Sequence, residues 1–455
     1  MTKSAAPGFD QPRPSGIPAS SPSPPTGLIF PARLTRNRWT RILGVAFVMY
    51  VLAFVDRVNL SMAAPFIRED LGLSPAGLGF ATGLFFWGYI ILQIPAGRLA
   101  STWSPKRVLL CLLLLWSSIS LTTALVNTPI ELAINRFALG LSEGGVLTCT
   151  LVLIRNWFTK AERARANALF LLTFPIGPMI AGPISGLILA YSHWRWMFVI
   201  EAIPGLFWSL VWWWAIDDRP EDAKWLPERE RADLIQKLAA EEDDATVKIS
   251  GHWLSTLWHP TVLLLALYNF LALMAEWGVN FWFPTVLKET GLPIGIVGLL
   301  TAVPSVLGII MMMLVASSSD RLRERKWHMI AATAAAGVPL LILHFTGGGV
   351  WATVICLSIA TGAFLGRFGP FWTLPGEVLP ASVAGVGIGL INGVGNLGGT
   401  VGPYFFGVVK THTGSFLLAL EAGGASLLSS TARSGFSGPH RRRYGRRADI
   451  WRSAG

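Results

Sequence analysis

The stretch Phe54-Val55-Asp56-Arg57-Val58-Asn59 lies inside an apolar run that extends from about Ile42 to Ile67. Such a run is slightly longer than the ~20 residues that a helix needs to cross ~30 Å of hydrocarbon. A carboxylate and a guanidinium inside it are costly unless they pair or face water. Asp56 and Arg57 therefore predict either a structural ion pair between helices or a water-lined transport site.

The composition indicates a polytopic membrane protein. Of the 455 residues, 52% are hydrophobic and 14% are charged, whereas a soluble chain usually carries ~25% charged residues. The net charge of +11 comes from basic residues near the ends of apolar runs, so it requires no nucleic-acid partner. The three cysteines lie in apolar runs without ligand spacing, which predicts no disulfide, no metal site and no cofactor.

Apolar runs of spanning length recur along the chain, and we expect each to be a transmembrane helix. Eleven are found, at about 42–67, 78–100, 107–127, 130–154, 166–190, 195–216, 260–287, 294–316, 327–346, 350–374 and 381–409. The stretch between the sixth and seventh is polar and charged, which is typical of a linker.

These runs divide the chain into five expected parts. They are a disordered cytoplasmic arm at 1–38, a six-helix bundle at 39–216, a cytoplasmic linker at 217–259, a second bundle at 260–428 with five clear helices and a partial twelfth, and a basic, aberrant tail at 429–455.

The two expected bundles repeat one another in sequence. Pro65 and Gly72 recur as Pro284 and Gly291, at an offset of 219. Lys106 recurs as Lys326, and Gly182-Pro183 as Gly402-Pro403, at an offset of 220. With an even number of spans in each half, this is the parallel repeat of transporters whose two bundles rock around a central site.

The distribution of lysine and arginine predicts the orientation in the membrane. Fifteen basic residues precede span one or follow spans two, four and eight, whereas the opposite connections carry only Arg68, Arg195, Lys288 and Lys410. Because cytoplasmic loops are enriched in Lys and Arg, we expect the N-terminus and the linker to be cytoplasmic.

Over about residues 40–416 the chain resembles the major facilitator superfamily and, within it, the anion:cation symporter family. The motifs that carry this resemblance are Asp56-Arg57-Val58-Asn59-Leu60-Ser61, Gly88-Tyr89, Arg136-Phe137-Ala138-Leu139-Gly140-Leu141-Ser142-Glu143, Asp218-Arg219-Pro220, Phe281-Trp282-Phe283-Pro284, Ser319-Asp320-Arg321 and Asn392-Gly393-Val394-Gly395-Asn396. The run 218–226 looks most like members that carry tartrate, phthalate and similar carboxylates.

The resemblance implies an all-α membrane protein of two pseudo-symmetric six-helix bundles around a central cavity. Family members typically bring an organic anion inward together with protons, so we expect a monomeric inner-membrane symporter driven by the proton gradient. The residues that match the family's substrate-binding positions are Arg57, Tyr89, Arg136, Asn392 and Asn396, and those that match its proton-coupling positions are Asp56 and Glu143. Asp320 and Arg321 match a latch that holds one conformation.

The chain departs from the family pattern in two places. Ser101 stands where the loop between spans two and three usually has an Asp, so the first of two latches is expected to be weaker. After Leu428 the sequence turns polar and then basic at Arg441-Arg442-Arg443, where a twelfth span should continue. A frame change or damaged gene explains this ending, and a short, divergent twelfth helix is the alternative.

Chemical arguments support several of these positions. Arg136 and Glu143 are seven residues apart, which places them two turns and ~10.5 Å apart on one helix face. An anion in a low dielectric favours a planar guanidinium fork, and proton coupling needs a carboxylate whose surroundings change as the cavity opens. We therefore expect Arg57 to bind the substrate carboxylate, and Arg136 to pair with Glu143 and to contact substrate as well.

The remaining polar residues have weaker arguments. Tyr89 and Trp372 fit substrate contact or simple aromatic packing, and Asn392 and Asn396 fit substrate contact or hydrogen bonds between helices. The repeat mates of Arg136 and Glu143 are Cys356 and Ala363, so the second half is expected to lack their pair. Four further candidates remain. Glu276 is a polar group in span seven, and Arg367 is a candidate second anion contact. Glu201 is expected to be a structural acid, and His344 an interfacial residue.

Other functions are less well supported by the sequence. An organophosphate/phosphate antiporter of the same fold would need basic residues from both halves, and span seven has none before Lys288. A non-transporting remnant is the alternative raised by the tail. A membrane enzyme is not expected, because no metal-ligand cluster or activated nucleophile is evident.

Overall fold

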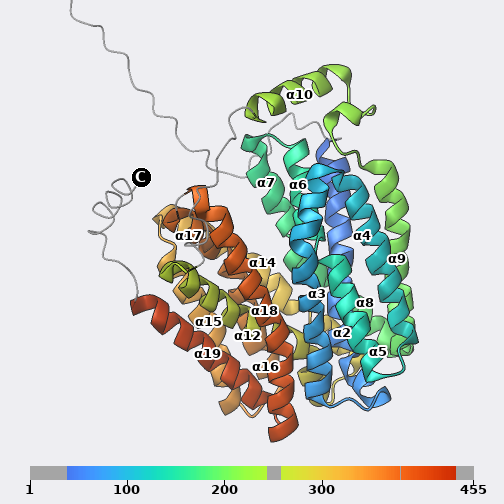
Figure 1. The fold of residues 1–455 in the computed structure, drawn as a ribbon. Helices are drawn as coiled ribbons and strands as arrows, with labels where there is room; N and C mark the ends of the chain where they lie inside the picture. The colour runs from blue at the N-terminus through green and yellow to red at the C-terminus, as the bar shows by residue number, and fades with distance from the viewer. Residues whose placement is uncertain (1–37, 243–257, 380, 437–455) are drawn as a thin grey trace, which may run out of the picture. The chain divides into compact units, whose positions relative to one another are not determined.

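The computed structural model describes residues 38–242, 258–379 and 381–436, and the only regular secondary structure in them is helical. Nearly all of the expected arm at 1–38, and most of the tail expected at 429–455, lie outside these residues. The expected all-α membrane fold is confirmed, with two sets of helices lying side by side (Figure 1).

The N-terminal set of helices covers residues 39–215. Its elements are η1 (Trp39–Gly44), α2 (Val45–Asp70), α3 (Pro75–Thr102), α4 (Pro105–Thr122), η2 (Thr123–Leu125), α5 (Pro129–Glu143), α6 (Val146–Trp157), α7 (Lys160–Leu171), α8 (Thr173–Tyr191) and α9 (Trp194–Ala215).

The polar connection that follows contains η3 (Pro220–Asp222) and α10 (Glu228–Glu242). The C-terminal set then comprises α12 (Pro260–Glu289), α13 (Ile294–Leu300), α14 (Val303–Leu322), α15 (Lys326–Phe345), α16 (Val350–Gly366), α17 (Phe368–Val378), α18 (Ala381–Thr413) and α19 (Phe416–Phe436).

Several helices begin with the same local device. Ser74, Ser104 and Thr128 each accept a hydrogen bond from a backbone N–H of the first turn, and a proline follows at the first helical position. A side-chain oxygen satisfies one of the free amides of a helix start, and proline loses no hydrogen bond there. The sequence thus fixes where α3, α4 and α5 begin.

The expected spans correspond closely to these helices. Among the described residues, ten helices or pairs of consecutive helices are long and apolar enough to cross a membrane, and the eleventh expected span, 381–409, lies within α18. Some spans consist of two consecutive helices. The fourth span breaks at Gly144-Gly145 between α5 and α6, and the tenth breaks at Arg367 between α16 and α17.

The twelfth helix is short as a membrane element. The apolar part of α19, Phe416–Ser430, is shorter than the ~20 residues that span a bilayer. Its backbone stays helical to Phe436, past residue 428 where the sequence placed the end of the bundle. A twelfth helix whose apolar part is too short to span the membrane agrees with the expected fold.

The two sets contact one another through a few helices. Helix α18 packs along α3, α13 and α14 pack on α8, and α12 meets α2. We call the end that carries residues 103–104, 158–159 and α10 the linker end, and the end that carries residues 71–74, 192–193, 290–293 and 414–415 the far end (Figure 1).

The two sets approach most closely at the far end. A Cβ placed on Gly79 or Gly83 of α3 would come within 2.4 Å of the backbone oxygen of Pro403 or Thr400 in α18. A Cβ on Gly298 of α13 would lie 2.5 Å from the oxygen of Gly182 in α8. Small residues permit such approach, so the far end is closed in this conformation.

The repeated glycines mark equivalent turns of the two sets. Gly72 and Gly291 follow α2 and α12 at the far end, with φ of +62° and +89°. A residue with a Cβ rarely adopts these angles, which explains why glycine occupies both turns.

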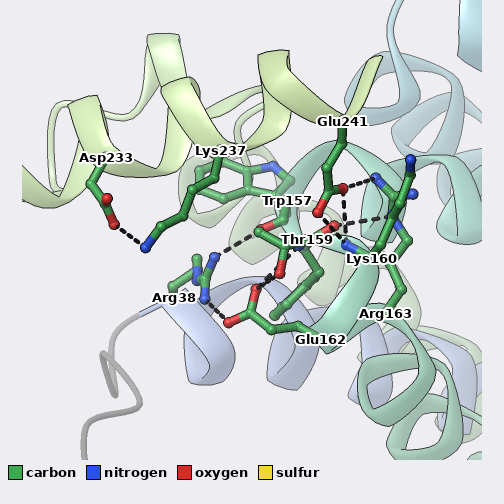
Figure 2. Close-up of polar contacts among 10 residues, drawn as sticks. Arg38, Trp157, Thr159, Lys160, Glu162, Arg163, Asp233, Lys237 and Glu241 are labelled. Atoms are coloured by element: carbon green, nitrogen blue, oxygen red, sulfur yellow. Dashed lines mark hydrogen bonds and ion pairs between the residues drawn. The ribbon is translucent and has the colours of Figure 1, made fainter. Parts of the chain in front are cut away.

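The connection after α9 is anchored to the N-terminal set at the linker end. Asp218 accepts hydrogen bonds from Ser104 Oγ (2.7 Å) and the Lys106 amide (2.8 Å). Figure 2 shows Glu241 of α10 accepting from the Lys160 amide at 2.9 Å and pairing with Arg163. These contacts tie residues 217–242, expected only to be a linker, to this set of helices.

Candidate functional site

A small cavity lies between the two sets of helices at mid-depth. It measures about 70 Å³, whereas ligand pockets are commonly ~300–1,000 Å³, so it is contracted in this conformation. The N-terminal set lines it with Asp56, Arg57, Val58, Leu60, Ser61, Thr82, Phe85, Phe86 and Arg136, and the C-terminal set with Trp277, Asn280, Phe281 and Pro403.

Arg57 and Glu143 form a buried ion pair beside this cavity. Arg57 Nε donates to Glu143 Oε2 at 2.7 Å, and the two side chains are 8% and 0% exposed. Arg57 Nη2 and Glu143 Oε1 are buried without a hydrogen-bond partner in the described residues. The guanidinium therefore has an N–H free for a second acceptor, and the carboxylate has a free oxygen.

Asp56 is buried on the same helix, next to the ion pair. It accepts hydrogen bonds from Ser120 Oγ of α4 and from Asn59 Nδ2 at 3.4 Å. Hydrogen bonds rather than an ion pair hold this carboxylate, so it can gain a proton without releasing a cation. It lines the cavity with Arg57 and Arg136.

The partner of Arg136 differs from the one expected. Arg136 Nη2 donates to Thr123 Oγ1 at 2.7 Å and to Asn135 Oδ1 at 3.0 Å, and no ion pair joins it to Glu143 in the described residues. A separation of seven residues spans ~10.5 Å along a helix, too far for direct contact. Arg57 of α2 reaches Glu143 instead, so the predicted pairing of Arg136 with Glu143 is wrong.

Aromatic rings surround the Arg57 guanidinium. Its carbon lies 4.9 Å from the centroid of the Phe54 ring and 5.3 Å from that of Tyr89, with Tyr50 and Phe85 at 5.6 Å. Rings within ~6 Å attract a cation and exclude water from it. Tyr89 thus packs on a cavity-lining arginine, although it does not itself line the cavity in this conformation.

Three other predicted substrate contacts lie in the C-terminal set, away from the contracted cavity. Trp372 of α17 packs edge-on against Phe371, with ring centroids 5.0 Å apart, in an apolar cluster. Asn392 and Asn396 of α18 are half-buried and have no side-chain hydrogen bond with the described part of the chain. Their contact with substrate stays a prediction.

The predicted latch residues lie at the linker end. Asp320 is 69% exposed and pairs with Arg325 at 2.5 Å, within its own loop. Arg321 is exposed. No contact from these residues to the N-terminal set is seen in the described residues, so the latch function also stays a prediction.

The C-terminal set holds a buried ion pair that the sequence did not predict. Arg367 Nη2 donates to Glu276 Oε2 at 3.0 Å, and the Arg367 side chain is 1% exposed. The repeat mates of Arg136 and Glu143 are Cys356 and Ala363, as expected, and the C-terminal ion pair is formed at other positions. The available signal was Glu276 itself, which stands at the repeat position of Arg57, at an offset of 219.

Two other candidates have separate surroundings. Glu201 is buried in α9 and accepts from Ser185 Oγ of α8 at 2.7 Å. His344 lies near the far end and contacts Glu421 of α19 at 3.2 Å, consistent with its expected place near an outer helix end. Sequence reasoning also missed Ser120, Thr123 and Asn135, because polar partners of a charge carry no spacing signal.

A second hollow, of about 290 Å³, lies at the far end. It is lined by Pro65, Arg68, Glu69, Leu73, Thr285, Lys288 and Glu289, and none of the predicted site residues borders it. Within the described residues, no group of three or more His, Cys, Asp and Glu side chains could hold a metal ion. The chemistry of the molecule is therefore concentrated around the central cavity.

The geometry of the central cavity combines an anion donor with titratable acids. Two arginines and one carboxylate line it, and a second carboxylate lies directly behind Arg57. Such a site can bind an anion and can gain or lose protons. Its placement between two packed sets of helices suits a solute that crosses from one end to the other.

Comparison with known proteins identifies the fold family. The family model described as Major Facilitator Superfamily matches residues 46–403. This chain belongs to the Major Facilitator Superfamily. It is therefore a multi-pass membrane protein and a secondary transporter, and not an enzyme.

Individual relatives of this superfamily agree with the predicted branch. A protein of Agrobacterium vitis named "Putative tartrate transporter" is 34% identical over 85% of this chain and 87% of its own length. One of Cupriavidus necator, named "Probable sulfoacetate transporter SauU", is 30% identical over 88% and 93%. These names are consistent with the resemblance to the anion:cation symporter family.

A solved structure supports the fold. That of the xylose transporter XylE from E. coli, in an inward open conformation, has a TM-score of 0.71 at 15% identity, covering 89% of this chain and 97% of that one. At this identity the likeness bears on the helical architecture alone, which is the one expected from the sequence.

Proposed function

We propose that this transporter is a proton-coupled symporter that carries a small organic carboxylate into the cell across the inner membrane. The observation that carries this proposal is the ion pair of Arg57 and Glu143 at 2.7 Å, adjoining a cavity that Asp56 and Arg136 also line. The names of the relatives add that tartrate and sulfoacetate, both small organic anions, are handled by similar proteins.

Arg57 is the substrate contact in this proposal. Its planar fork can hold a carboxylate by two parallel hydrogen bonds, and Nη2 already lacks a partner. The aromatic rings around it keep water away, which strengthens the interaction with an anion. Arg136, fixed by Thr123 and Asn135, adds positive potential on the same cavity wall.

Glu143 couples the substrate to a proton by competing for Arg57. A buried guanidinium without an anion is strongly unfavourable, so Arg57 must keep one partner at every step. When Glu143 takes a proton, its attraction for Arg57 falls and a substrate carboxylate can replace it without a change in net charge. Asp56, held by Ser120 and Asn59, provides a second place for a proton on the cavity wall.

Close packing of the two sets at the far end is consistent with the proposed inward transport. From the excess of Lys and Arg on the loops of the linker end, we infer that this end and the N-terminus face the cytoplasm. The close glycine contacts of α3 with α18 and of α8 with α13 then seal the outer side. In this proposal, the next step from this conformation is opening at the linker end, which would release substrate and protons toward the cytoplasm.

Uptake into proteoliposomes tests the proposal. Purified protein is given labelled tartrate, phthalate, an aldonate and an aldarate, with and without an acidic exterior. We expect at least one anion to accumulate faster with the imposed gradient, and a protonophore to abolish the difference. Uptake that requires phosphate inside the vesicles would show the antiporter instead, and no uptake of any anion would contradict the proposal.

A further inference from the structure

The ion pair between Glu276 and Arg367 is a buried charged group to which transport has so far given no role. Glu276 lies in the middle of α12, and Arg367 lies at the break between α16 and α17. Asn269 Oδ1 is 3.5 Å from Arg367 Nη1, and Arg367 Nε is buried without a partner in the described residues. This guanidinium, like that of Arg57, retains an unused N–H.

The repeat relates this pair to the one in the N-terminal half, but with the charges exchanged. Glu276 occupies the repeat position of Arg57 at the offset of 219, and that of Asp56 at the offset of 220. At the offset of 220 the mate of Glu143 is Ala363, and Arg367 lies about one helical turn beyond it. Each half therefore holds one arginine against one glutamate between its first and fourth helices.

The C-terminal pair lies close to the cavity wall. Asn280 lines the cavity and lies one turn after Glu276 on the same face of α12. Asn280 Oδ1 accepts from Thr361 Oγ1 of α16 at 3.1 Å, so α12 and α16 face one another at both levels. Trp277, next to Glu276, also lines the cavity.

The same pair adjoins the contact between the two halves. Phe368 follows Arg367 directly, and its ring lies 5.9 Å from that of Phe174 in α8. The pair is displaced from the cavity toward the linker end, because α12 begins at that end and Glu276 precedes Asn280.

We propose that Arg367 and Glu276 form a second carboxylate subsite, so that the preferred substrate is a dicarboxylate. One end of the substrate binds Arg57 in the N-terminal half, and the other replaces Glu276 on Arg367 in the C-terminal half. This inference rests on the proposed transport of organic carboxylates. It names the substrate class of that site and gives the substrate a means of drawing the two halves together.

The exchange of partners preserves the charge around each arginine. A guanidinium that leaves one carboxylate for another keeps its counter-ion, and the displaced Glu276 takes up a proton as Glu143 does, so that neither group is left as an unpaired buried charge. A monocarboxylate can satisfy only one of the two arginines. It is therefore expected to bind more weakly and to promote closure less well than a dicarboxylate of the same length.

Matched substrate pairs test the inference in proteoliposomes that contain the full chain. D-Glucarate and D-gluconate share a six-carbon chain and differ in the second carboxylate, and L-tartrate and L-threonate are the four-carbon equivalents. For the wild type we expect a KM at least tenfold lower for the dicarboxylate of one pair. In R367Q that preference should fall to less than twofold, while uptake of the monocarboxylate stays within twofold of wild type.

Two further variants separate specificity from folding. E276Q frees Arg367 from its competitor, so the KM for the dicarboxylate should fall two- to fivefold while that for the monocarboxylate does not change. E421Q removes the far-end partner of His344 in the same half and should alter neither. A gain in affinity is an outcome that loss of a structural ion pair would not produce.

The opposite outcomes are distinct from failure of the proposed function. Uptake of monocarboxylates with no dicarboxylate preference would overturn the inference and leave the symporter intact. An equal loss of both substrates in R367Q, or an equal loss in E276Q, would also overturn it and assign the pair to structure. A wild type that takes up neither member of either pair would contradict the proposed function itself.

Discussion

Each half of this transporter buries one arginine–glutamate ion pair, but the helices that carry the arginine and the glutamate are exchanged between the halves. In the N-terminal half the arginine is on the first helix and the glutamate on the fourth, whereas in the C-terminal half the glutamate is on the first and the arginine at the break in the fourth. The N-terminal pair has Asp56 and Arg136 beside it on the cavity wall. The C-terminal pair has neutral neighbours, Asn269 and Asn280.

This difference indicates a division of labour. Additional titratable and cationic groups in the N-terminal half provide places for protons and for the first carboxylate. The C-terminal half supplies one arginine, its glutamate partner and amide groups, which suit recognition of the second carboxylate. The two halves thus keep the same helices and one buried ion pair each. They differ in the number of additional charged residues around that pair.

Removal of Arg57 is the change expected to have the largest effect. R57Q leaves Glu143 buried without its cation and removes the anion donor, and breaking a buried pair in this way costs ~3–5 kcal/mol. We expect uptake of mono- and dicarboxylates alike to fall at least ~100-fold, since each 1.4 kcal/mol is a factor of ten. Initial rates of labelled uptake in proteoliposomes measure it.

The comparison with R367Q sharpens this prediction. R57Q should abolish both substrate classes, whereas R367Q should affect only dicarboxylates. R57K, which keeps the charge but loses the planar fork, is the matched control and should retain part of the activity. Uptake within tenfold of wild type in R57Q would show that Arg57 is not the main anion contact.

An alanine at Gly298 should have the next largest effect, because it acts on the contact between halves. Its Cβ would lie 2.5 Å from the Gly182 oxygen, so α8 and α13 could not close at the far end. We expect uptake to fall about tenfold as the outward-open state becomes favoured by ~1.4 kcal/mol. An impermeant maleimide should then label T285C faster in a chain whose three native cysteines are replaced.

The control for this substitution lies one turn earlier on the same helix. A Cβ on Gly295 would meet its nearest neighbour, Ala190, at 3.6 Å, an ordinary contact. G295A should therefore leave both uptake and labelling unchanged. Equal behaviour of the two variants would show that close packing of α8 and α13 does not govern the movement of the halves.

Loss of the Asp320 carboxylate is expected to have the smallest effect. D320N breaks an exposed pair with Arg325, and such pairs are usually worth ~0–1 kcal/mol. Uptake should change by less than about fivefold, and D233N, at the exposed pair with Lys237 on α10 in Figure 2, should change it by less than twofold. A tenfold loss in D320N alone would instead support a strong conformational latch.

Much of the fold could be predicted from the sequence because membrane spans are governed by hydropathy and length. The Pro and Gly landmarks located the repeat, since Gly72 and Gly291 occupy turns that require positive φ. The sequence did not predict the residues at which a membrane span divides into two consecutive helices. The ends of α5 at Glu143 and of α16 at Gly366 place the charged residues, and both depend on neighbouring helices.

The sequence grouped four charged residues that lie close together in the structure, but it did not give their pairing. The sequence predicted that these four charged residues lie close together: Asp56, Arg57, Arg136 and Glu143. In the structure, Asp56, Arg57 and Arg136 line one cavity, and Glu143 lies behind Arg57. Spacing along one helix suggested the pair Arg136–Glu143, but contacts between α2 and α5 decide it. Arg367 was a candidate anion contact, but its pairing with Glu276 was not predicted, because Arg367 lies one turn away from the position that strict repetition specifies.

Proton-driven accumulation by E143Q tests the central claim most directly. The glutamine resembles a permanently protonated Glu143, so exchange of labelled for unlabelled substrate across the vesicle membrane should persist within about threefold of wild type. Accumulation against a substrate gradient, and its dependence on external pH, should be lost. If E143Q still accumulates substrate with an undiminished pH dependence, Glu143 does not couple the proton to the anion, and the account of the Arg57–Glu143 pair is wrong.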